Sequence, residues 1–377
     1  MMVARKVRLV PDKAQEQWLK ENAGVARFIY NWALSYKIQQ YRDYDISVHQ
    51  SEIMREITDM KYTNDYSWLQ GYSSETIKQS VKDMLSAYNN FFRNGNKGFP
   101  KFKKRGNCEE SFYVRYDCIY SVDNRHIKFP KLDKSIKISE DCFIVKGTIQ
   151  NPRVSFDGKY WYLAYSFDAE PLTKELTDEI LGIDLGIEKL ATCSSGVEYR
   201  NINKDKNVRR LESRKRRLQR SISRAYIKNK QGNKYIKTNN IEKLEKKVRL
   251  IDRKLSNIRK TYIHQVTMEI VKTKPLKIVI EDLNIKGLMK NKFMAKSIQD
   301  CLWYFFRQCL SYKAEFYGGI HVIVANRFFP STKRCNQCGF VKKSVPLWVR
   351  TYRCTNCGYV CNRDLNASYN LRDLALS

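Results

Sequence analysis

Four cysteines near the end of the chain constrain its fold more than any other feature. Cys335, Cys338, Cys354 and Cys357 form two Cys-x-x-Cys-Gly motifs, with 15 residues between Cys338 and Cys354. Each motif lets two thiolates reach one ion, and two motifs complete the closed tetrahedral set of a structural zinc site. A redox pair would explain one motif alone, but not two at this spacing. We therefore expect a zinc ribbon over residues 330–360, whose folding depends on the metal.

The overall charge indicates a polyanionic partner. The chain has 70 Lys and Arg residues against 39 Asp and Glu residues, which gives a formal net charge of +31. Phosphate contacts to DNA or RNA would neutralise this charge and release counterions. A membrane surface is a weaker alternative, because no apolar run approaches the roughly 18 residues that a spanning helix needs. The first residues also lack the apolar stretch of a secretory signal, so we expect an intracellular protein.

A strand and a helical block open the chain. Residues 2–10 alternate basic and apolar side chains, which is typical of a strand with one cationic face. Residues 12–95 then show helical periodicity and dense aromatic side chains, most of which we expect in a core. A loop is expected at 94–98. The first strand, isolated from other strands, needs partners further along the chain.

Short β-like runs occupy residues 99–170. Between two of them, Asp157-Gly158 indicates a hairpin, since both residues tolerate the positive φ angles of a type I′ turn. We expect these runs to join the first strand in a small β-barrel formed by residues 1–11 and 96–172. The helical block would then be an insertion into that barrel.

Two basic segments are candidate nucleic-acid contacts. Residues 99–105 interleave aromatic and cationic side chains, as backbone-tracking surfaces do; a solvated basic loop is the alternative. Residues 204–260 hold 22 Lys and Arg residues against five Asp and Glu residues, whereas an ordinary solvated helix mixes both signs. We predict phosphate contacts by Lys101, Lys103, Lys104, Arg105, Arg209, Arg210, Arg214, Lys215, Arg216, Arg217 and Arg220.

From about residue 178 onward, strands alternate with helices, which indicates an α/β domain. An apolar strand that begins near residue 180 is interrupted by Asp184, and another that begins at residue 277 ends in Glu281. An acid on an apolar strand is costly to bury unless it is paired or bound to a metal. A last helix is expected to begin near Asp364.

Asp184, Glu281 and Asp364 could form the metal site of a nuclease. Two divalent ions about 4 Å apart can activate a water and stabilise the leaving 3′-oxygen in phosphodiester hydrolysis. Hard oxygen ligands favour Mg²⁺ or Mn²⁺. Each acid alone could equally be a helix cap or a surface carboxylate, and Asp364 could simply complement a helix dipole. The hypothesis therefore rests on all three acids, with the zinc ribbon between the second and the third.

Several short motifs connect these features. They are Arg27-Phe28-Ile29-Tyr30-Asn31, Ile183-Asp184-Leu185-Gly186, Ile280-Glu281-Asp282-Leu283, Pro330-Ser331-Thr332-Lys333, the two cysteine motifs, and Arg363-Asp364-Leu365-Asn366-Ala367. Together they resemble the TnpB (OrfB) family of transposon-associated proteins, which are related to type V CRISPR effectors. The resemblance covers nearly the whole chain, and the combination is far more specific than any one motif.

The resemblance implies a multidomain fold of the α/β and α+β classes. A RuvC-like, RNase H-like nuclease domain would comprise residues 178–329 and 361–377, with the zinc ribbon inserted. The barrel would be the wedge domain, carrying the helical recognition domain. The implied activity is RNA-guided cleavage of double-stranded DNA beside a short transposon-associated motif. Asp184, Glu281 and Asp364 would hold Mg²⁺ or Mn²⁺, and Cys335, Cys338, Cys354 and Cys357 would hold Zn²⁺.

The same resemblance implies a guide RNA from the transposon end, a monomer bound to it, and action on the nucleoid of a prokaryotic cytoplasm. Two alternatives stay open. Some relatives have lost catalytic acids and repress transcription by RNA-guided DNA binding, and RNase H-like transposases that join DNA directly also use three carboxylates. All three acids are present here, which favours an active nuclease. Positive charge spread over several segments suits a large RNA plus a DNA duplex.

Overall fold

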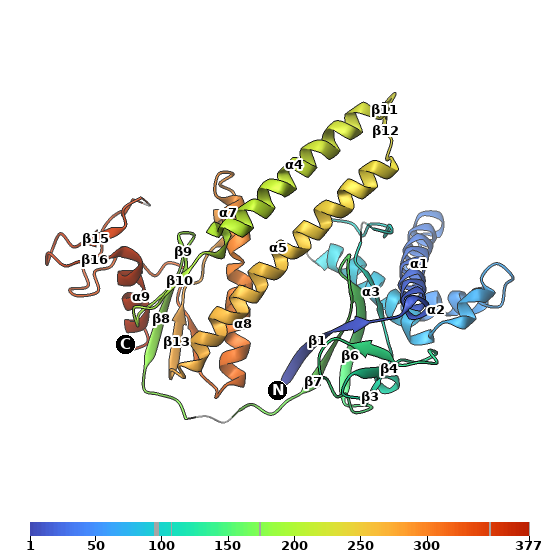
Figure 1. Ribbon diagram of the computed structural model, residues 1–377, viewed down its shortest axis with the longest axis horizontal. Coiled ribbons are helices and arrows are strands. Elements are labelled where there is room, and N and C mark those ends of the chain that lie inside the picture. Colours follow the sequence, from blue (N-terminus) through green and yellow to red (C-terminus); the bar gives the residue numbers. More distant parts are fainter. Residues whose placement is uncertain (94–97, 107, 173–174, 347, 377) are drawn as a thin grey trace. The chain divides into compact units, whose positions relative to one another are not determined.

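The computed structural model describes all residues except 94–97, 107, 173–174, 347 and 377. The chain divides into two compact units, residues 1–169 and residues 170–377 (Figure 1). Each unit has its own apolar core. Of the loop expected at 94–98, only Gly98 lies within the described residues, and the expected barrel boundary at residue 96 lies outside them. No helix among the described residues is long and apolar enough to cross a membrane.

The first unit is built on a seven-stranded sheet in the order β2-β6-β7-β1-β5-β4-β3. Its first strand finds the partners that the sequence requires: it pairs antiparallel with β7, Met2 opposite Asp168 and Leu9 opposite Trp161, and its end pairs with β5. The strands are β1 (Met2–Val10), β2 (Glu110–Tyr113), β3 (Tyr120–Asp123), β4 (His126–Lys128), β5 (Ile136–Ile138), β6 (Ile149–Phe156) and β7 (Trp161–Asp168).

This sheet is open, so the expected closed β-barrel is wrong. Within the described residues, the edge strands β2 and β3 do not pair with each other. Helix α1 (Lys13–Tyr44) packs against the sheet instead, and its Leu19, Ala23 and Ala26 belong to the apolar core of the sheet. The ring of Trp18 packs edge-on against Phe112 of β2 and Phe129 after β4, with centroids 5.8 Å and 6.1 Å away. Helix side chains thus supply the apolar contacts that a closing strand pair would make.

The hairpin between β6 and β7 forms as expected, but its turn is not type I′. Phe156 pairs with Trp161, so the connection has four residues, and Gly158 is the residue there with positive φ, at 92°. The carboxylate of Asp157 accepts hydrogen bonds from the backbone N–H groups of Lys159 and Tyr160. The aspartate side chain therefore organises the turn, as in an Asx turn.

The helical block has its own apolar cluster, which includes Ile29, Ile53 and Ile77. Helix α1 begins at a capping box, in which Asp12 accepts from the backbone N–H of Gln15 and the Gln15 side chain accepts from that of Asp12. The other helices of the block are α2 (Gln50–Met60), the short 3₁₀ helix η1 (Ser67–Gly71) and α3 (Ser74–Arg93).

The second unit contains a five-stranded mixed sheet in the order β10-β9-β8-β13-β14. Strand β8 runs antiparallel to β9 and parallel to β13, which is parallel to β14. Ile183 of β8 is aligned with Ile280 of β13. The strands are β8 (Ile180–Leu185), β9 (Lys189–Cys193), β10 (Glu198–Arg200), β13 (Lys277–Ile280) and β14 (His321–Val324).

Helices cover both faces of this sheet (Figure 1). Alternation along β8 and β13 turns Ile183 and Ile280 toward α5 and α8, and turns Gly182 and Val279 toward α9. Residues 295–316 form two helices and not one, because Leu302 between them has a positive φ of 52°. The helices are α4 (Lys206–Lys228), α5 (Asn239–Lys272), α6 (Ile285–Leu288), α7 (Ala295–Cys301), α8 (Trp303–Phe316) and α9 (Arg363–Asp373).

Two short hairpins complete the second unit. One, β11 (Lys230–Gln231) with β12 (Lys234–Tyr235), connects α4 to α5. The other, β15 (Thr351–Arg353) with β16 (Val360–Asn362), belongs to the cysteine segment and leads directly into α9.

Gly182 lets α9 lie directly on β8. A Cβ atom added at this glycine would stand 2.0 Å from the carbonyl oxygen of Ser368 and 2.5 Å from the backbone nitrogen of Arg372. Both obstacles are backbone atoms, so a side chain could fit only if the helix moved. A glycine within a strand often marks such a close backbone approach. The spacing between strand and helix here depends on that missing side chain.

We expect Gly182→Ala to destabilise the second unit, because the added methyl group forces α9 away from the sheet. Overpacking of this kind typically costs about 1–3 kcal/mol, so the unfolding temperature should fall. Gly71→Ala is the matched control: it has an ordinary φ angle and no atom within 4 Å of an added Cβ. Equal unfolding temperatures for the two variants, measured by calorimetry, would contradict the close contact between α9 and β8.

Candidate active site

The parallel strands place Asp184 and Glu281 side by side. Because Ile183 is aligned with Ile280, the next residue of each chain segment stands at the same level of the sheet. Both side chains point to the face that α9 covers, since Gly182 and Val279, two residues earlier, also face that helix. The two carboxyl groups share a hydrogen bond and are closely surrounded by protein atoms, although each residue as a whole is partly exposed.

Helix α9 brings Asp364 to the same edge. Ser368 lies over Gly182, and Asp364 is one helical turn before Ser368, just as Asp184 is two residues beyond Gly182 along the strand. Asn362 caps the helix by accepting from the backbone N–H of Asp364 at 2.9 Å. Arg350, from the cysteine segment, reaches the Asp364 carboxylate at 3.7 Å. The three acids predicted from the sequence therefore lie at one edge of the sheet.

Negative charge is concentrated and poorly solvated at this edge. Burial, with the neighbouring Glu281 and Asp364 carboxylates, raises the pKa of Asp184 well above its usual range. Burial also raises the pKa of Glu281, against the opposing effect of a hydrogen bond from Ser331. Two adjacent carboxyl groups with raised pKa values favour sharing a proton or binding a cation.

The donor chemistry of the three acids fits a divalent cation. Carboxylate oxygens are the hard ligands that Mg²⁺ and Mn²⁺ prefer. The acids do not form the tightest possible cluster: among the described residues, only the four cysteines bring three or more potential ligand atoms all within 4.8 Å of one another. A wider spacing still suits carboxylates that serve two ions about 4 Å apart. Asp184, Glu281 and Asp364 are thus the residues that would hold such ions.

Without added Mg²⁺ or Mn²⁺, the protein should lose stability as pH rises, and Asp184→Asn should lessen that loss. Unfolded, Asp184 and Glu281 ionise near pH 4. Folded, their raised pKa values keep protons bound above about pH 4, so the folded state binds more protons and stability falls as pH increases. Unfolding temperatures at pH 5 and pH 8 measure the effect. An equally steep fall in wild type and Asp184→Asn would contradict the raised pKa.

Ser331 is a site residue whose role the sequence did not reveal. Its hydroxyl donates to the Glu281 carboxylate, and its carbonyl accepts from the side-chain amide of Asn370 at 2.7 Å. The amides of Asn366 and Asn370 also both donate to the carbonyl of Arg334, at 2.8 Å and 2.7 Å. Two buried asparagines on α9 therefore hold the segment that orients Glu281. The sequence signal that could have pointed to this role was the position of Ser331 in the motif Pro330-Ser331-Thr332-Lys333.

The four cysteines lie together as the sequence predicts. Sulfur atoms of Cys335 and Cys357 are 3.7 Å apart, and those of Cys338 and Cys354 are 3.6 Å apart. Four sulfurs at about 2.3 Å from one zinc ion in a tetrahedron are separated by about 3.8 Å. A hydrogen bond from the backbone of Phe340 lowers the pKa of Cys338, whereas burial raises the pKa of Cys335, so the sulfur geometry carries the assignment. The residues present therefore fit Zn²⁺.

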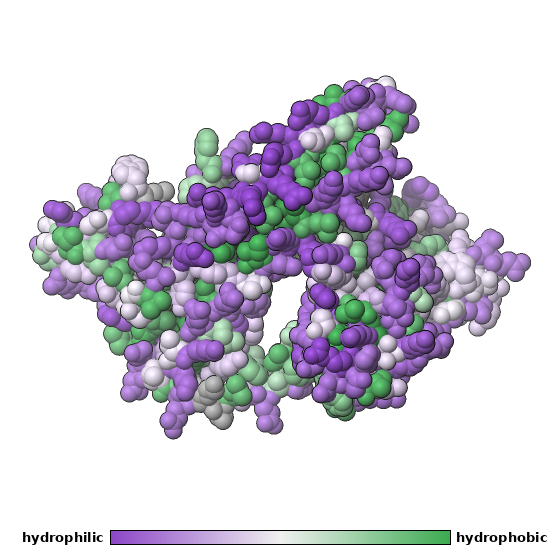
Figure 2. Space-filling view, viewed as in Figure 1, coloured by the Kyte–Doolittle hydropathy of each residue, from purple (hydrophilic) through white to green (hydrophobic). Residues whose placement is uncertain are grey.

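Helix α4 presents most of the predicted cationic contacts to solvent. Its apolar side chains, Val208 among them, pack against Ile251 and Leu255 of α5. The surface over α4 is mainly hydrophilic in Figure 2. Lys215 is partly buried and paired with Asp252 at 2.5 Å. The exposed candidates, which make no ion pair within the described part of the chain, are Arg209, Arg210, Arg214, Arg216, Arg217 and Arg220.

The basic loop of the first unit is fixed by Lys103, whose ammonium faces inward. The backbone N–H and carbonyl of Lys103 both bond the side-chain amide of Asn31, at 2.7 Å and 2.8 Å. Its ammonium lies 3.9 Å from the centroid of the Tyr30 ring, and burial lowers its pKa. Lys103 therefore anchors the loop to α1. The other predicted contacts of this loop, Lys101, Lys104 and Arg105, are exposed.

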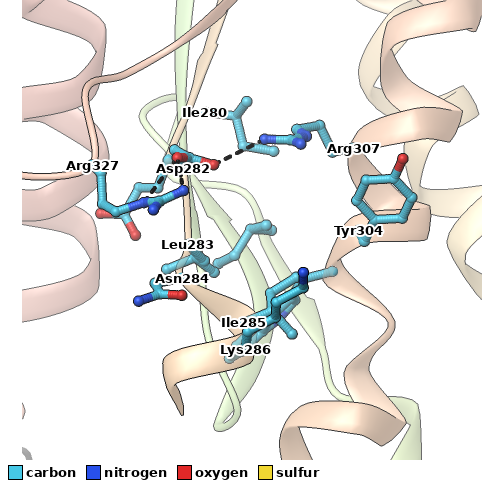
Figure 3. Close-up of a pocket in the computed structure, with 12 residues that line it drawn as sticks. Ile280, Asp282, Leu283, Asn284, Ile285, Lys286, Tyr304, Arg307 and Arg327 are labelled. Carbon is cyan, nitrogen blue, oxygen red and sulfur yellow. Dashed lines mark hydrogen bonds and ion pairs between the residues drawn. The ribbon is translucent and has the colours of Figure 1, made fainter. Parts of the chain in front are cut away.

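A pocket of about 360 Å³ lies beside Glu281, which helps to line it together with Leu185. Asp282 accepts hydrogen bonds from Arg307 at 3.1 Å and from Arg327 at 2.7 Å (Figure 3). Hydrogen bonds from Arg327 and Arg307 lower the pKa of Asp282 below its usual range. These two arginines were not predicted, because nothing in their local sequence shows that the fold brings them to Asp282.

Three family models match successive parts of the chain. A model described as a helix-turn-helix domain (OrfB, IS605) matches residues 1–44, which here form β1 and α1. A model described as a probable transposase (OrfB, IS605) matches residues 163–292. A model described as a Cas12f1-like TNB domain matches residues 303–371, which include the four cysteines and Asp364.

Relatives match over nearly the full length. A protein of Escherichia coli (strain K12), "Putative RNA-guided DNA endonuclease InsQ", is 30% identical over 386 residues, covering 98% of this chain and 91% of the relative. "Putative RNA-guided DNA endonuclease" of Streptomyces pristinaespiralis is 28% identical over 375 residues, covering 98% and 88%. The cryo-EM structure of a Cas12f1-sgRNA-target DNA complex has a TM-score of 0.60 at 15% identity, covering 96% of this chain and 83% of that one, a likeness of fold.

Proposed function

Because the chain belongs to the TnpB (OrfB) family, we propose that it is an RNA-guided DNA endonuclease of a transposon. It cuts double-stranded DNA beside a short transposon-associated motif by metal-dependent phosphodiester hydrolysis. The observation that carries this proposal is the meeting of Asp184, Glu281 and Asp364 at one edge of the sheet. A repressor that only binds DNA would have no need of two adjacent carboxyl groups that burial makes costly, with a third acid beside them.

The acids and their neighbours have distinct roles in this proposal. Asp184, Glu281 and Asp364 hold Mg²⁺ or Mn²⁺, which would supply an activated water and stabilise charge on the leaving oxygen. Ser331 orients Glu281 through its hydroxyl, and the asparagines of α9 hold Ser331 in place. Arg350 lies close enough to Asp364 to offset part of its negative charge.

The domain assignment follows the same reasoning. Residues 178–329 and 361–377 form the RuvC-like nuclease domain, and residues 330–360 form the zinc ribbon, which carries Ser331 and precedes Asp364 in the chain. The open sheet of residues 1–11 and 96–172 serves as the wedge domain, and residues 12–95 serve as the recognition domain. The exposed arginines of α4 and the loop cations Lys101, Lys104 and Arg105 contact phosphates of the guide RNA or the target DNA.

The test is to express the chain with its native flanking DNA and to sequence the nucleic acid that copurifies. A discrete RNA that maps to the flanking DNA is expected. The purified complex should then cut a duplex that matches the guide, only with Mg²⁺ or Mn²⁺ and only beside the adjacent motif. Guided binding without cleavage would favour the repressor. Absence of a discrete RNA, with protein that still cuts or joins DNA, would favour the unguided transposase.

A further inference from the structure

Asp282 pairs with two arginines close to Glu281, but its single negative charge does not neutralise both arginines. It carries one negative charge, whereas Arg307 of α8 and Arg327 after β14 carry two positive charges. Each guanidinium has five N–H donors. Arg307 uses one of them on Asp282 and Arg327 uses two, and the described residues offer the others no further partner. Both side chains are also partly exposed, 34% for Arg307 and 50% for Arg327.

The same pocket offers an aromatic surface. Tyr304, one turn before Arg307 on α8, is 56% exposed, and the Arg307 guanidinium carbon lies 5.7 Å from its ring centroid. Figure 3 shows Arg307 and Arg327 reaching Asp282 from two sides, with Tyr304 of α8 on the same side as Arg307. Trp303 also lines the pocket, and its buried indole N–H has no acceptor among the described residues.

We propose that this pocket binds one nucleotide of the DNA strand being cut, next to the scissile phosphate. Arg307 and Arg327 bind the phosphate of this nucleotide with their free N–H donors, and Tyr304 stacks on its base. Guanidinium groups match phosphate geometry, and one stacked base is a typical contact of single-stranded nucleic acid. Glu281 lines the same pocket, so a strand bound there continues directly to the acids. This inference rests on the proposed function and assigns the strand contacts of that same site.

Asp282 is a positioning residue in this arrangement. Asp282 directly follows Glu281 in the chain, and its carboxylate accepts hydrogen bonds from both arginines. It therefore holds both guanidinium groups away from the Glu281 carboxylate. Without the Asp282 carboxylate, either arginine could pair with Glu281, which lines the same pocket. Asp282→Asn is therefore expected to weaken strand binding less than removal of the arginines does, and to raise the Mg²⁺ concentration needed for half-maximal cleavage.

The first experiment measures binding apart from cleavage. The guide-bound Asp184→Asn protein is irradiated with single-stranded DNA that carries 5-iodouracil at successive positions, and the crosslinked peptide is identified by mass spectrometry. We expect a crosslink at Tyr304, retained in Tyr304→Phe and lost in Tyr304→Leu. Crosslinks elsewhere in the chain, with none at Tyr304 from any position of the strand, would overturn the stacking assignment.

The second experiment measures cleavage and its salt dependence. With Arg307→Ala and Arg327→Ala combined, the DNA concentration for half-maximal cleavage should rise about tenfold or more. The slope of log affinity against log salt should fall by about one for each phosphate that the protein no longer binds, a change that a merely structural role would not produce. Arg42→Ala is the matched control, since Arg42 is an exposed arginine paired with Asp43 outside the pocket. Unchanged affinity and slope in the double variant would overturn the subsite.

The two proposals can fail separately. If the wild-type complex cuts no DNA but the strand still crosslinks to Tyr304, the proposed function fails and the strand site stands. If the complex cuts DNA normally and the variants of Arg307, Arg327 and Tyr304 change neither crosslinking nor affinity, the strand site fails and the proposed function stands.

Discussion

Asp184→Asn, Glu281→Gln and Asp364→Asn should each reduce DNA cleavage by about 1,000-fold or more. Removing a single group that stabilises charge in a transition state typically costs about 100- to 1,000-fold, and these carboxylates also hold the metal. Each substitution keeps the size of the side chain and removes its charge. Binding of guide RNA and target DNA should stay within a few-fold of wild type, because none of the three acids is itself a predicted phosphate contact. Single-turnover cleavage and filter binding measure the two properties.

A matched control for these variants lies on the same sheet. Glu188, in the turn between β8 and β9, is an exposed carboxylate paired with Lys204, and it does not belong to the group of three acids. Glu188→Gln should cut DNA at the wild-type rate. Cleavage retained in any one of the three variants would remove that residue from the metal site. Loss of RNA binding together with cleavage would show that the residue supports the fold instead.

The acids were predictable because their sequence environment is unusual. Asp184 interrupts an apolar strand, and Glu281 directly follows another, so the alternation of strand residues together with the register places them side by side. Gly182 carried a usable signal as well, since a glycine inside a strand marks a close backbone approach. The sequence could not show that α9 is the element that packs against Gly182, because Ser368 lies more than 180 residues further along the chain.

Features that depend on distant partners escaped prediction. The first strand was expected to need partners, and it has them, but whether the sheet closed depended on Trp18 packing between Phe112 and Phe129. The pairing of Asp282 with Arg307 and Arg327 joins three separate elements. Lys103 looked like its basic neighbours, yet Asn31 and Tyr30 turn it inward. In each case the local pattern is unremarkable and the tertiary contact decides the role.

Cys354→Ser should release zinc and abolish cleavage, because the zinc ribbon connects two parts of the active site. Its first end carries Ser331, which donates to Glu281, and its second end continues through β16 into the helix that holds Asp364. Zinc binding contributes about 10 kcal/mol or more to the folding of such sites, far more than a small ribbon can replace by packing. Metal analysis should find one zinc per wild-type chain and close to none in the variant.

Cys361→Ser is the control that distinguishes the effect of losing zinc from the effect of losing any nearby cysteine. Cys361 lies on β16, close in sequence to Cys357, but it is not part of the group of four sulfur atoms. This variant should keep its zinc and its cleavage, whereas Cys354→Ser loses both and becomes sensitive to proteolysis within residues 330–360. Thermal unfolding of the first unit should be the same in both, since its core contains no ribbon residue. Normal zinc content in Cys354→Ser would rule out the four-cysteine site and, with it, the dependence of Glu281 and Asp364 on the ribbon.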